Sequence, residues 1–190
     1  MTRRSLVTIL AEDQRQQRFA YQYLKQRGYL PHEIYADEIP KKGSGSGEQW
    51  VRLRYANNVE AYRAQAASPR IGLVVMIDAD TGRVVDRSQQ LSAALTKAGS
   101  HSRGRSEKIA HLIPKRNIET WILCLNARRP NGHPVNEDED YKNHSEARNI
   151  DELIKPAAEA FFAWSRPNAV PPAHCVPSLR SAIPEVRRLE

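Results

Sequence analysis

Short apolar runs alternate with amphipathic stretches along most of the chain. One run, Ile71-Gly-Leu-Val-Val-Met-Ile77, is rich in β-branched residues and is followed at once by Asp78 and Asp80. A run of this length is too short for an independent helix and is typical of a strand that is buried on both faces. Such strands belong to parallel sheets, so we expect this segment to be the central strand of one.

Three further segments predict strands of the same sheet. Residues 5–11 are nearly all apolar and end at Glu12, whereas residues 32–36 and 109–113 form weaker and shorter runs. Between the runs, apolar residues recur at the spacing of an amphipathic helix. The predicted helices lie at residues 14–27, 48–67, 84–95, 118–125, 149–162 and 179–189.

The order of strand, acid and helix occurs twice and predicts an α/β protein. We assign residues 1–129 to one α/β domain with a mostly parallel, Rossmann-like sheet of about four strands flanked by helices. Residues 130–190 predict an acidic loop and a helical C-terminal extension that packs on the same domain. The acidic run at residues 137–140 predicts a solvated turn, because it lacks the spaced oxygens and the glycine of an EF-hand loop.

Composition argues against several classes of protein. No apolar run approaches the roughly 20 residues of a membrane span, and none near the N-terminus is long enough for a secretory signal. We therefore expect a cytoplasmic protein that does not contact a membrane. Cys124 and Cys175 form no C-x-x-C motif and are predicted to be buried fillers. Residues 41–47 predict a flexible loop without the Gly-Lys-Ser/Thr ending of a P-loop, so ATP binding is not supported.

Positive charge is concentrated in the middle of the chain. Residues 81–129 carry 10 basic and 3 acidic side chains, and this excess of 7 equals the whole net charge of +7. The segment includes a basic loop at residues 101–108 that we predict to be mobile without a ligand. A basic block that follows a pair of carboxylates suits a polyanion, although a solvated basic face would have the same composition.

Four acidic residues follow predicted strands or begin a predicted helix: Glu12, Asp78, Asp80 and Glu119. Parallel crossovers bring the carboxyl ends of strands to one edge of a sheet, so these acids can converge there. Clustered carboxylates repel one another, which makes the arrangement favourable mainly around a divalent cation. The alternatives are a helix cap for Asp78, a turn for Asp80 and an offset of the helix dipole for Glu119.

These residues resemble a known family. A glutamate after the first strand and an Asp-x-Asp after a later buried strand are similar to the Toprim fold of topoisomerases, primases and overcoming-lysogenization-type nucleases. The segment Ile118-Glu-Thr-Trp-Ile-Leu123 is similar to the acid-x-Trp-Leu-Leu helix of small stand-alone Toprim-like proteins such as the RloB-like family. The resemblance covers about residues 5–126. It departs from the family at Asp13, where glycine is usual.

The resemblance implies a metal-dependent nuclease that cleaves phosphodiester bonds of DNA or RNA. Asp78 and Asp80 would hold Mg²⁺ or Mn²⁺, Glu12 would be a metal ligand or the general acid/base, and Glu119 would complete the catalytic site. Many relatives are encoded in prokaryotic antiviral defence loci beside an ATPase, so an ATPase partner is expected, and a homo-oligomer is possible.

Six cations near the acids are candidates for contacts with nucleic-acid phosphates. Each could also be surface decoration. The six are Arg83, Arg87, Arg103, Arg105, Lys115 and Arg116. His101 and His111 could serve a proton transfer, but a lone histidine in a loop or strand is more often structural.

Two other functions fit part of the pattern. A phospho-acceptor receiver domain has acids after its first strand, an Asp after its third and a late Lys, and Glu12, Asp13, Asp78 and Lys115 could fill these positions. That assignment leaves Asp80 unexplained. The other alternative is a catalytically silent Toprim-like module that binds nucleic acid or a partner protein.

Overall fold

The computed structural model describes residues 6–40, 46–68 and 70–190. In these residues the strands form a four-stranded, all-parallel sheet in the order β2-β1-β3-β4. The fold is therefore α/β, as predicted. The strands are β1 (Val7–Ala11), β2 (Ile34–Ala36), β3 (Gly72–Met76) and β4 (Ile109–Leu112).

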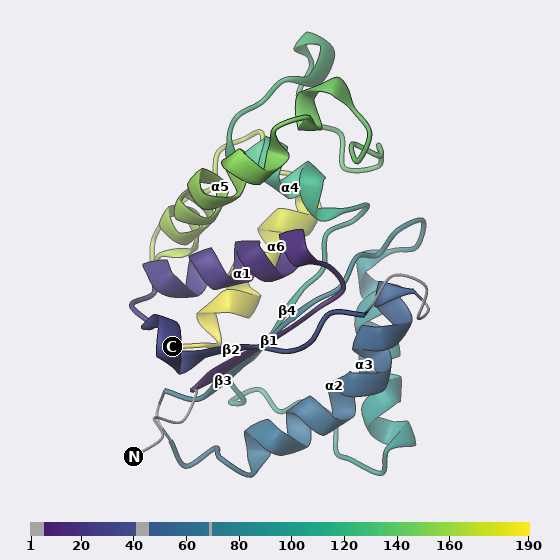
Figure 1. Cartoon of the computed structure of the whole chain (residues 1–190), viewed down its shortest axis with the longest axis vertical. Helices are drawn as coiled ribbons and strands as arrows, with labels where there is room; N and C mark the ends of the chain where they lie inside the picture. The colour runs from purple at the N-terminus through teal and green to yellow at the C-terminus, as the bar shows by residue number, and fades with distance from the viewer. Residues whose placement is uncertain (1–5, 41–45, 69) are drawn as a thin grey trace.

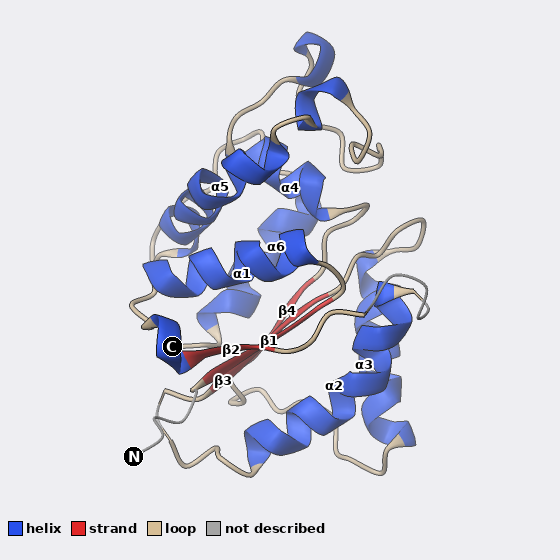
Figure 2. Cartoon of the chain, viewed as in Figure 1, coloured by secondary structure: helices blue, strands red, loops and turns tan. Residues whose placement is uncertain are grey.

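Helices cover both faces of the sheet and make a three-layer structure (Figures 1 and 2). One face carries α1 (Gln14–Gln26), α4 (Ile118–Leu125), α5 (Ile150–Ser165) and α6 (Pro177–Arg187). The other face carries α2 (Gly47–Arg63) and α3 (Val84–Lys97). Each face of the sheet buries its own apolar cluster, because alternate residues of a strand point to opposite faces.

The sheet grows in both directions from β1, and this sets where a ligand can bind. From β1 the chain passes to β2 on one side, and then returns to β3 on the other side. The connections leave the carboxyl ends of β1 and β3 in opposite directions, which opens a crevice between these two strands. In doubly wound sheets ligands bind at this switch point.

Most predicted elements are confirmed, with shifts at their ends. The predicted strand at residues 32–36 is shorter, because Pro31–Glu33 form a 3₁₀ turn in which Leu30 N donates to Glu33 Oε2 at 2.8 Å. The helix predicted at residues 48–67 ends at Arg63. Pro156 lies inside α5, on the exposed face of that helix. The predicted loop at residues 41–47 lies mostly outside the described residues.

Residues 130–190 complete the core on one face of the sheet. α5 lies along α1 and α4, where Phe161 packs against Phe19 and Trp121 at ring-centroid distances of 5.7 and 6.0 Å. The indole Nε1 of Trp121 donates to Ser178 Oγ at 2.9 Å, which ties α4 to the start of α6. Such aromatic packing contributes a large apolar area in a fixed geometry.

Side chains cover the outer edge of β4. Arg103 Nη1 donates to Ile109 O at 2.8 Å, and His111 N donates to Glu185 Oε2 at 2.9 Å. Arg103 and Glu185 also form an ion pair with each other. One donor and one acceptor of the exposed edge are thereby satisfied by a side-chain pair rather than by another strand.

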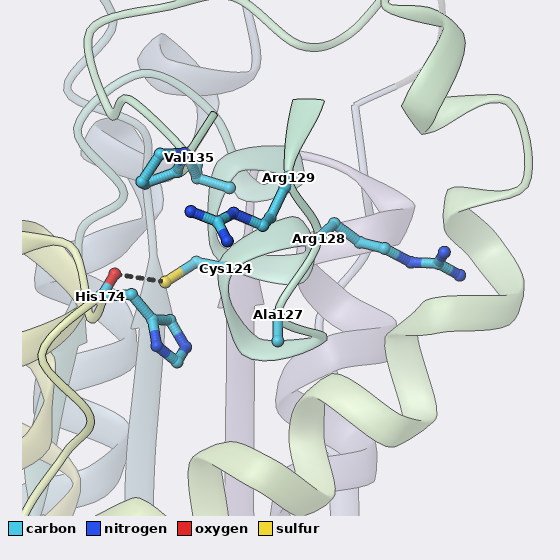
Figure 3. A pocket seen from close by; sticks show the side chains of 7 residues that line it. Cys124, Ala127, Arg128, Arg129, Val135 and His174 are labelled. Carbon is cyan, nitrogen blue, oxygen red and sulfur yellow. Dashed lines mark hydrogen bonds between the residues drawn. The ribbon is translucent and has the colours of Figure 1, made fainter. Parts of the chain in front are cut away.

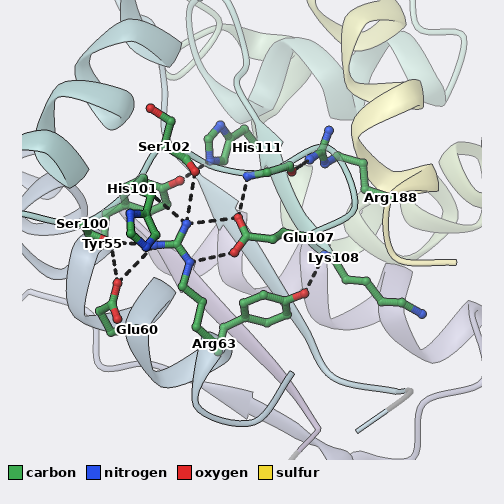
Figure 4. Close-up of polar contacts among 12 residues, drawn as sticks. Tyr55, Glu60, Arg63, Ser100, His101, Ser102, Glu107, Lys108, His111 and Arg188 are labelled. Carbon is green, nitrogen blue, oxygen red and sulfur yellow. Dashed lines mark hydrogen bonds and ion pairs between the residues drawn. The ribbon is translucent and has the colours of Figure 1, made fainter. Parts of the chain in front are cut away.

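Arg63 holds the loop that leads into β4 (Figure 4). Its guanidinium donates to Glu107 Oε1 at 2.7 Å, to Ser100 Oγ at 2.6 Å and to His101 O at 3.1 Å. The loop at residues 101–108, which we predicted to be mobile, is thus tied to α2 by several hydrogen bonds.

No helix within residues 6–40, 46–68 and 70–190 has the length and apolar character needed to cross a membrane.

Candidate functional site

Two predicted site residues meet at the switch point between β1 and β3. Because Ala11 pairs in register with Met76, the residues after the two strands leave the sheet side by side. Asp78 N donates to Glu12 Oε1 at 3.1 Å. The Asp78 side chain is buried, and its Oδ2 has no hydrogen-bond partner.

Glu119 approaches the same site from α4. Asn117 caps this helix, with its Oδ1 accepting from Thr120 N at 3.3 Å, so Glu119 falls in the first turn. Its Oε1 accepts from Arg15 Nη1 at 2.6 Å, whereas its Oε2 is buried without a partner. A buried carboxylate oxygen without a partner is costly, and Asp78 and Glu119 each carry one.

Burial and mutual repulsion shift the acidity of the site. Burial, followed by the charge of Asp80, raises the pKa of Glu12 to about 8. Burial, followed by the charge of Glu12, raises the pKa of Asp78 well above its usual value. Perturbations of this size by burial and like charge are common at functional sites.

Lys142 is one of the cations that face these acids. Burial lowers the pKa of its ammonium group, but the charges of Asp78 and Glu119 outweigh that effect and raise it. Lys142 is held in place by its neighbours: Tyr141 is buried, and Lys142 N donates to Asp140 Oδ1 at 3.0 Å.

The acidic run at residues 137–140 is largely exposed, as predicted, but it also anchors this segment. Ser178 N donates to Glu137 Oε2 at 2.8 Å, and Asn117 Nδ2 donates to Asp140 Oδ1 at 2.8 Å. Asp138 pairs with Lys115 at 3.1 Å. These contacts bind the segment to α6, to the cap of α4 and to the end of β4, and so they hold Lys142 near the acids.

Arg87 braces the turn that carries Asp78 and Asp80. The side chain is buried, with Nε donating to Asp78 O at 2.8 Å and Nη2 lying 3.4 Å from Asp80 Oδ2. It also pairs with Glu48 at the start of α2. Asp80 itself adopts a left-handed backbone conformation, with φ of 54°. We predicted Arg87 to contact phosphates, whereas here its donors are used within the protein.

The other predicted phosphate contacts are dispersed. Arg83 is exposed and pairs with Asp86. Lys115 Nζ donates to Gly82 O at 3.0 Å and pairs with Asp138. Arg103 and Arg105 precede β4, so they lie at the amino ends of the strands, whereas the acids lie at the carboxyl ends. Arg116 follows β4, so it lies with the acids at the carboxyl ends of the strands, and its side chain has no partner among the described residues.

The structure also draws in residues that the sequence did not single out. Gln16 bridges Glu12 and Asp78, Arg15 pairs with Glu119, and Lys142 faces the acids. Gln16 left a signal in the sequence, because it occupies an apolar-face position of α1, three residues before Phe19 and four before Ala20. Lys142 left none, because its position depends on contacts between distant segments.

An open hollow of about 900 Å³ lies beside these acids. Its walls come from the start of α1, the start of α4 and the segment that carries Lys142. The lining residues include Glu12, Arg15, Arg18, Glu119, Lys142 and Asp151. Of the four predicted acids, Glu12 and Glu119 line the hollow and are open to solvent or an extended ligand there, whereas Asp78 and Asp80 do not line it.

The fit of the site to a metal ion rests on its unpartnered oxygens. In the part of the chain that the structure describes, no three His, Cys, Asp or Glu side chains are gathered as a ready metal-binding group. Asp78 Oδ2 and Glu119 Oε2 nevertheless supply buried carboxylate oxygens of the kind that Mg²⁺ and Mn²⁺ prefer. The donor set therefore suits a hard divalent cation, and the metal-binding role stays a prediction.

A smaller hollow of about 280 Å³ lies at the far end of α4 (Figure 3). It is lined by Cys124, Ala127, Arg129, Val135 and His174, among others, and Cys124 Sγ lies 3.4 Å from His174 O. Both cysteines are buried, as predicted. Burial raises the pKa of the Cys124 thiol, which disfavours the nucleophilic thiolate at this position.

Comparison of the chain with models of protein families, with curated proteins and with solved structures found no match. The case for a function therefore rests on the residues and their geometry.

We predict that Arg87→Met lowers the free energy of unfolding by about 1–3 kcal/mol, because it leaves the buried Asp78 O without its donor and leaves Glu48 with Arg52 alone. Chemical denaturation monitored by circular dichroism measures this loss. Arg83→Met, which removes only an exposed pair at the start of the same helix, is the matched control and should unfold like the wild type. Equal stability of the two variants would contradict the bracing role of Arg87.

We predict that Gly47→Ala displaces Glu12. A Cβ atom at position 47 would lie 2.8 Å from Glu12 O and 2.9 Å from Glu12 Cβ, so the backbone after β1 must move. The expected cost is about 1–3 kcal/mol, although Ala normally stabilises a helix relative to Gly. Gly104→Ala meets nothing closer than 3.5 Å and should change stability by less than about 0.5 kcal/mol. A melting temperature of Gly47→Ala at or above the wild-type value would refute the close contact.

Proposed function

We propose that this protein is a metal-dependent nuclease that hydrolyses phosphodiester bonds of DNA or RNA. The observation that carries the proposal is the pair of buried, unpartnered carboxylate oxygens: Asp78 Oδ2 after β3, at the switch point of a parallel sheet, and Glu119 Oε2 in the first turn of α4, whose charge acts on Asp78. Such a site is electrostatically unfavourable by itself and becomes favourable when a divalent cation binds.

In this proposal the position of each acid determines whether it binds the metal or transfers a proton. Asp78 and Asp80, together with Glu12, hold Mg²⁺ or Mn²⁺, and Glu119 completes the site from α4. When bound, the cation supplies charge neutralisation at the scissile phosphate and lowers the pKa of water. Without a metal the pKa of Glu12 is about 8, which suits it to accept or return a proton where Asp78 and Asp80 hold the cation. As a direct ligand of the cation, Glu12 would instead stay ionised.

Cations at the rim of the hollow support a polyanionic substrate. Lys142 faces the acids, and Arg15 and Arg18 line the same hollow, although both arginines also pair with Asp151. Arg116 adds a guanidinium without a partner on the carboxyl edge of the sheet. A phosphate chain that enters the hollow would meet these groups before it reaches the acids.

The resemblance to Toprim-like proteins also supports a proposal about the role of the protein in the cell and its partners. We propose a role in prokaryotic antiviral defence, together with an ATPase partner and with homo-oligomer formation as a further possibility. These statements rest on the motifs at residues 12, 78–80 and 118–123 and on the agreement of an all-parallel sheet with a Rossmann-like fold.

We predict that Asp78→Asn abolishes Mg²⁺-dependent cleavage without loss of stability. The folded-state pKa values of Asp78 and Glu12 are raised, so their ionisation destabilises the fold as pH rises from about 4 toward 8. Removing one of the two charges should therefore leave the variant at least as stable as the wild type at pH 8. Gel assays with labelled single- and double-stranded DNA and RNA, together with thermal melts, test both parts.

The matched control for this variant is Asp86→Asn, which changes an exposed aspartate of α3 outside the site. It should retain wild-type cleavage. Full activity of Asp78→Asn would overturn the metal-site assignment. Wild-type protein that binds nucleic acid but cleaves none of the substrates with Mg²⁺ or Mn²⁺ would instead favour the silent binding module.

We predict that Arg116, but not Arg105, contacts substrate phosphate. Both guanidinium groups lack partners among the described residues. Of the two, only Arg116 lies at the carboxyl ends of the strands, where the acids are. Arg116→Gln should weaken oligonucleotide binding and flatten the plot of log K against log salt by about 0.7–0.9, the value for one phosphate. Arg105→Gln should leave the slope unchanged. Titrations in Ca²⁺ measure binding. A slope that changes in Arg105→Gln but not in Arg116→Gln would place the substrate at the amino ends of the strands.

A receiver-like phospho-acceptor is the second candidate, and two observations favour it. The strand order β2-β1-β3-β4 is the order with which flavodoxin-like sheets begin, and Lys142 faces Asp78 as a late lysine would. Lys115, the lysine first considered for that role, is engaged by Gly82 O and Asp138. Incubation with a small phosphodonor followed by mass spectrometry tests this candidate. A stable phosphate on Asp78 would favour it over the nuclease.

A further inference from the structure

Gln16 is a polar residue on the face of α1 that packs against the core. The buried residues of α1 are Gln16, Phe19, Ala20, Tyr23 and Leu24, and the Gln16 side chain has no solvent exposure. A buried amide is costly unless all of its groups find partners. Its retention at this position requires a specific set of hydrogen bonds.

Both ends of the amide are used, and their orientation is fixed. Glu12 N donates to Gln16 Oε1 at 3.1 Å, and Gln16 Nε2 donates to Asp78 Oδ1 at 2.9 Å. A backbone N–H can only donate, so the amide oxygen must face Glu12 and the NH₂ group must face Asp78. The assignment of oxygen and nitrogen therefore follows from the partners.

The three residues form a closed ring of hydrogen bonds. Glu12 N donates to Gln16, Gln16 donates to Asp78 Oδ1, and Asp78 N donates to Glu12 Oε1 at 3.1 Å. Arg87 Nε fixes the carbonyl of Asp78 from outside the ring. One oxygen of the Asp78 carboxylate is thus occupied, and Oδ2 is the one that stays free.

We propose that Gln16 is a positioning residue, which holds the Asp78 carboxylate so that Oδ2 alone is presented to a divalent cation. This inference rests on the proposed metal site. Only a neutral side chain with both a donor and an acceptor fits the position. A carboxylate would add negative charge to the buried site, a lysine would offset the negative charge that attracts the cation and could not accept from Glu12 N, and an apolar residue would leave Asp78 Oδ1 and Glu12 N unpaired.

The test measures the affinity of the folded protein for Mn²⁺ alone, by titration calorimetry and by the electron paramagnetic resonance signal of free Mn²⁺. Gln16→Met keeps the length of the side chain and removes both hydrogen bonds. We expect Mn²⁺ to bind about 10- to 100-fold more weakly, as when other groups that orient a metal ligand are removed. Asp78→Asn serves as the reference for loss of the site.

Gln17→Met is the matched control. Gln17 is the next residue of the same helix, and its Nε2 donates to Asp37 O at 2.8 Å, away from the acids. The variant makes the same chemical change and should bind Mn²⁺ like the wild type. A role of Gln16 in stability alone would lower the melting temperature of Gln16→Met but leave the Mn²⁺ affinity of the folded protein unchanged.

The outcomes separate the two proposals. Wild-type affinity in Gln16→Met, with binding lost in Asp78→Asn, would overturn the role of Gln16 and leave the metal site intact. Failure of the wild type to bind Mn²⁺ would overturn the metal site and the role of Gln16 with it. If Gln16→Met does not fold, Gln16→Asn keeps an amide that is too short to reach both partners. It should show the same loss, and unchanged affinity there would also overturn the inference.

Discussion

The structure depends on like charges that a parallel sheet forces together. Pairing of β1 with β3 sets Glu12 beside Asp78, and the hydrogen bond from Asp78 N to Glu12 Oε1 locks them there. Burial then removes the water that would screen their repulsion. The surrounding residues can be understood as responses to this constraint: they satisfy one oxygen of each acid, or they bring positive charge close without neutralising the site fully.

Positive charge reaches the acids from three different parts of the chain. Arg15 comes from α1, Arg87 from α3, and Lys142 from the segment between α4 and α5. Since the last of these is held by contacts of Glu137 and Asp140, residues beyond 129 shape the site as well as the core. A division of the chain into a functional part and an appended part would separate Lys142 from the acids it faces.

Much of the fold could be predicted because its signals are local. Buried parallel strands are apolar and β-branched throughout, and the convergence of Glu12 with Asp78 follows from parallel topology. The partners of the basic residues could not be predicted in this way. Arg87 pairs with Glu48 and Arg103 with Glu185, carboxylates 39 and 82 positions distant in sequence, so composition alone suggested a free basic face. Gln16 was overlooked because pattern analysis asks where apolar residues recur, not which polar residue interrupts them.

The side-chain pair on the outer edge of β4 limits how the protein can associate. Arg103 and Glu185 occupy the hydrogen-bonding positions at which an incoming strand would have to begin pairing. A strand from another chain would have to displace this ion pair before it gained its first backbone contact, and edge protection of this kind is a recognised barrier to strand addition. Growth of the sheet across molecules is therefore opposed on this side, and self-association there would have to use helical surfaces.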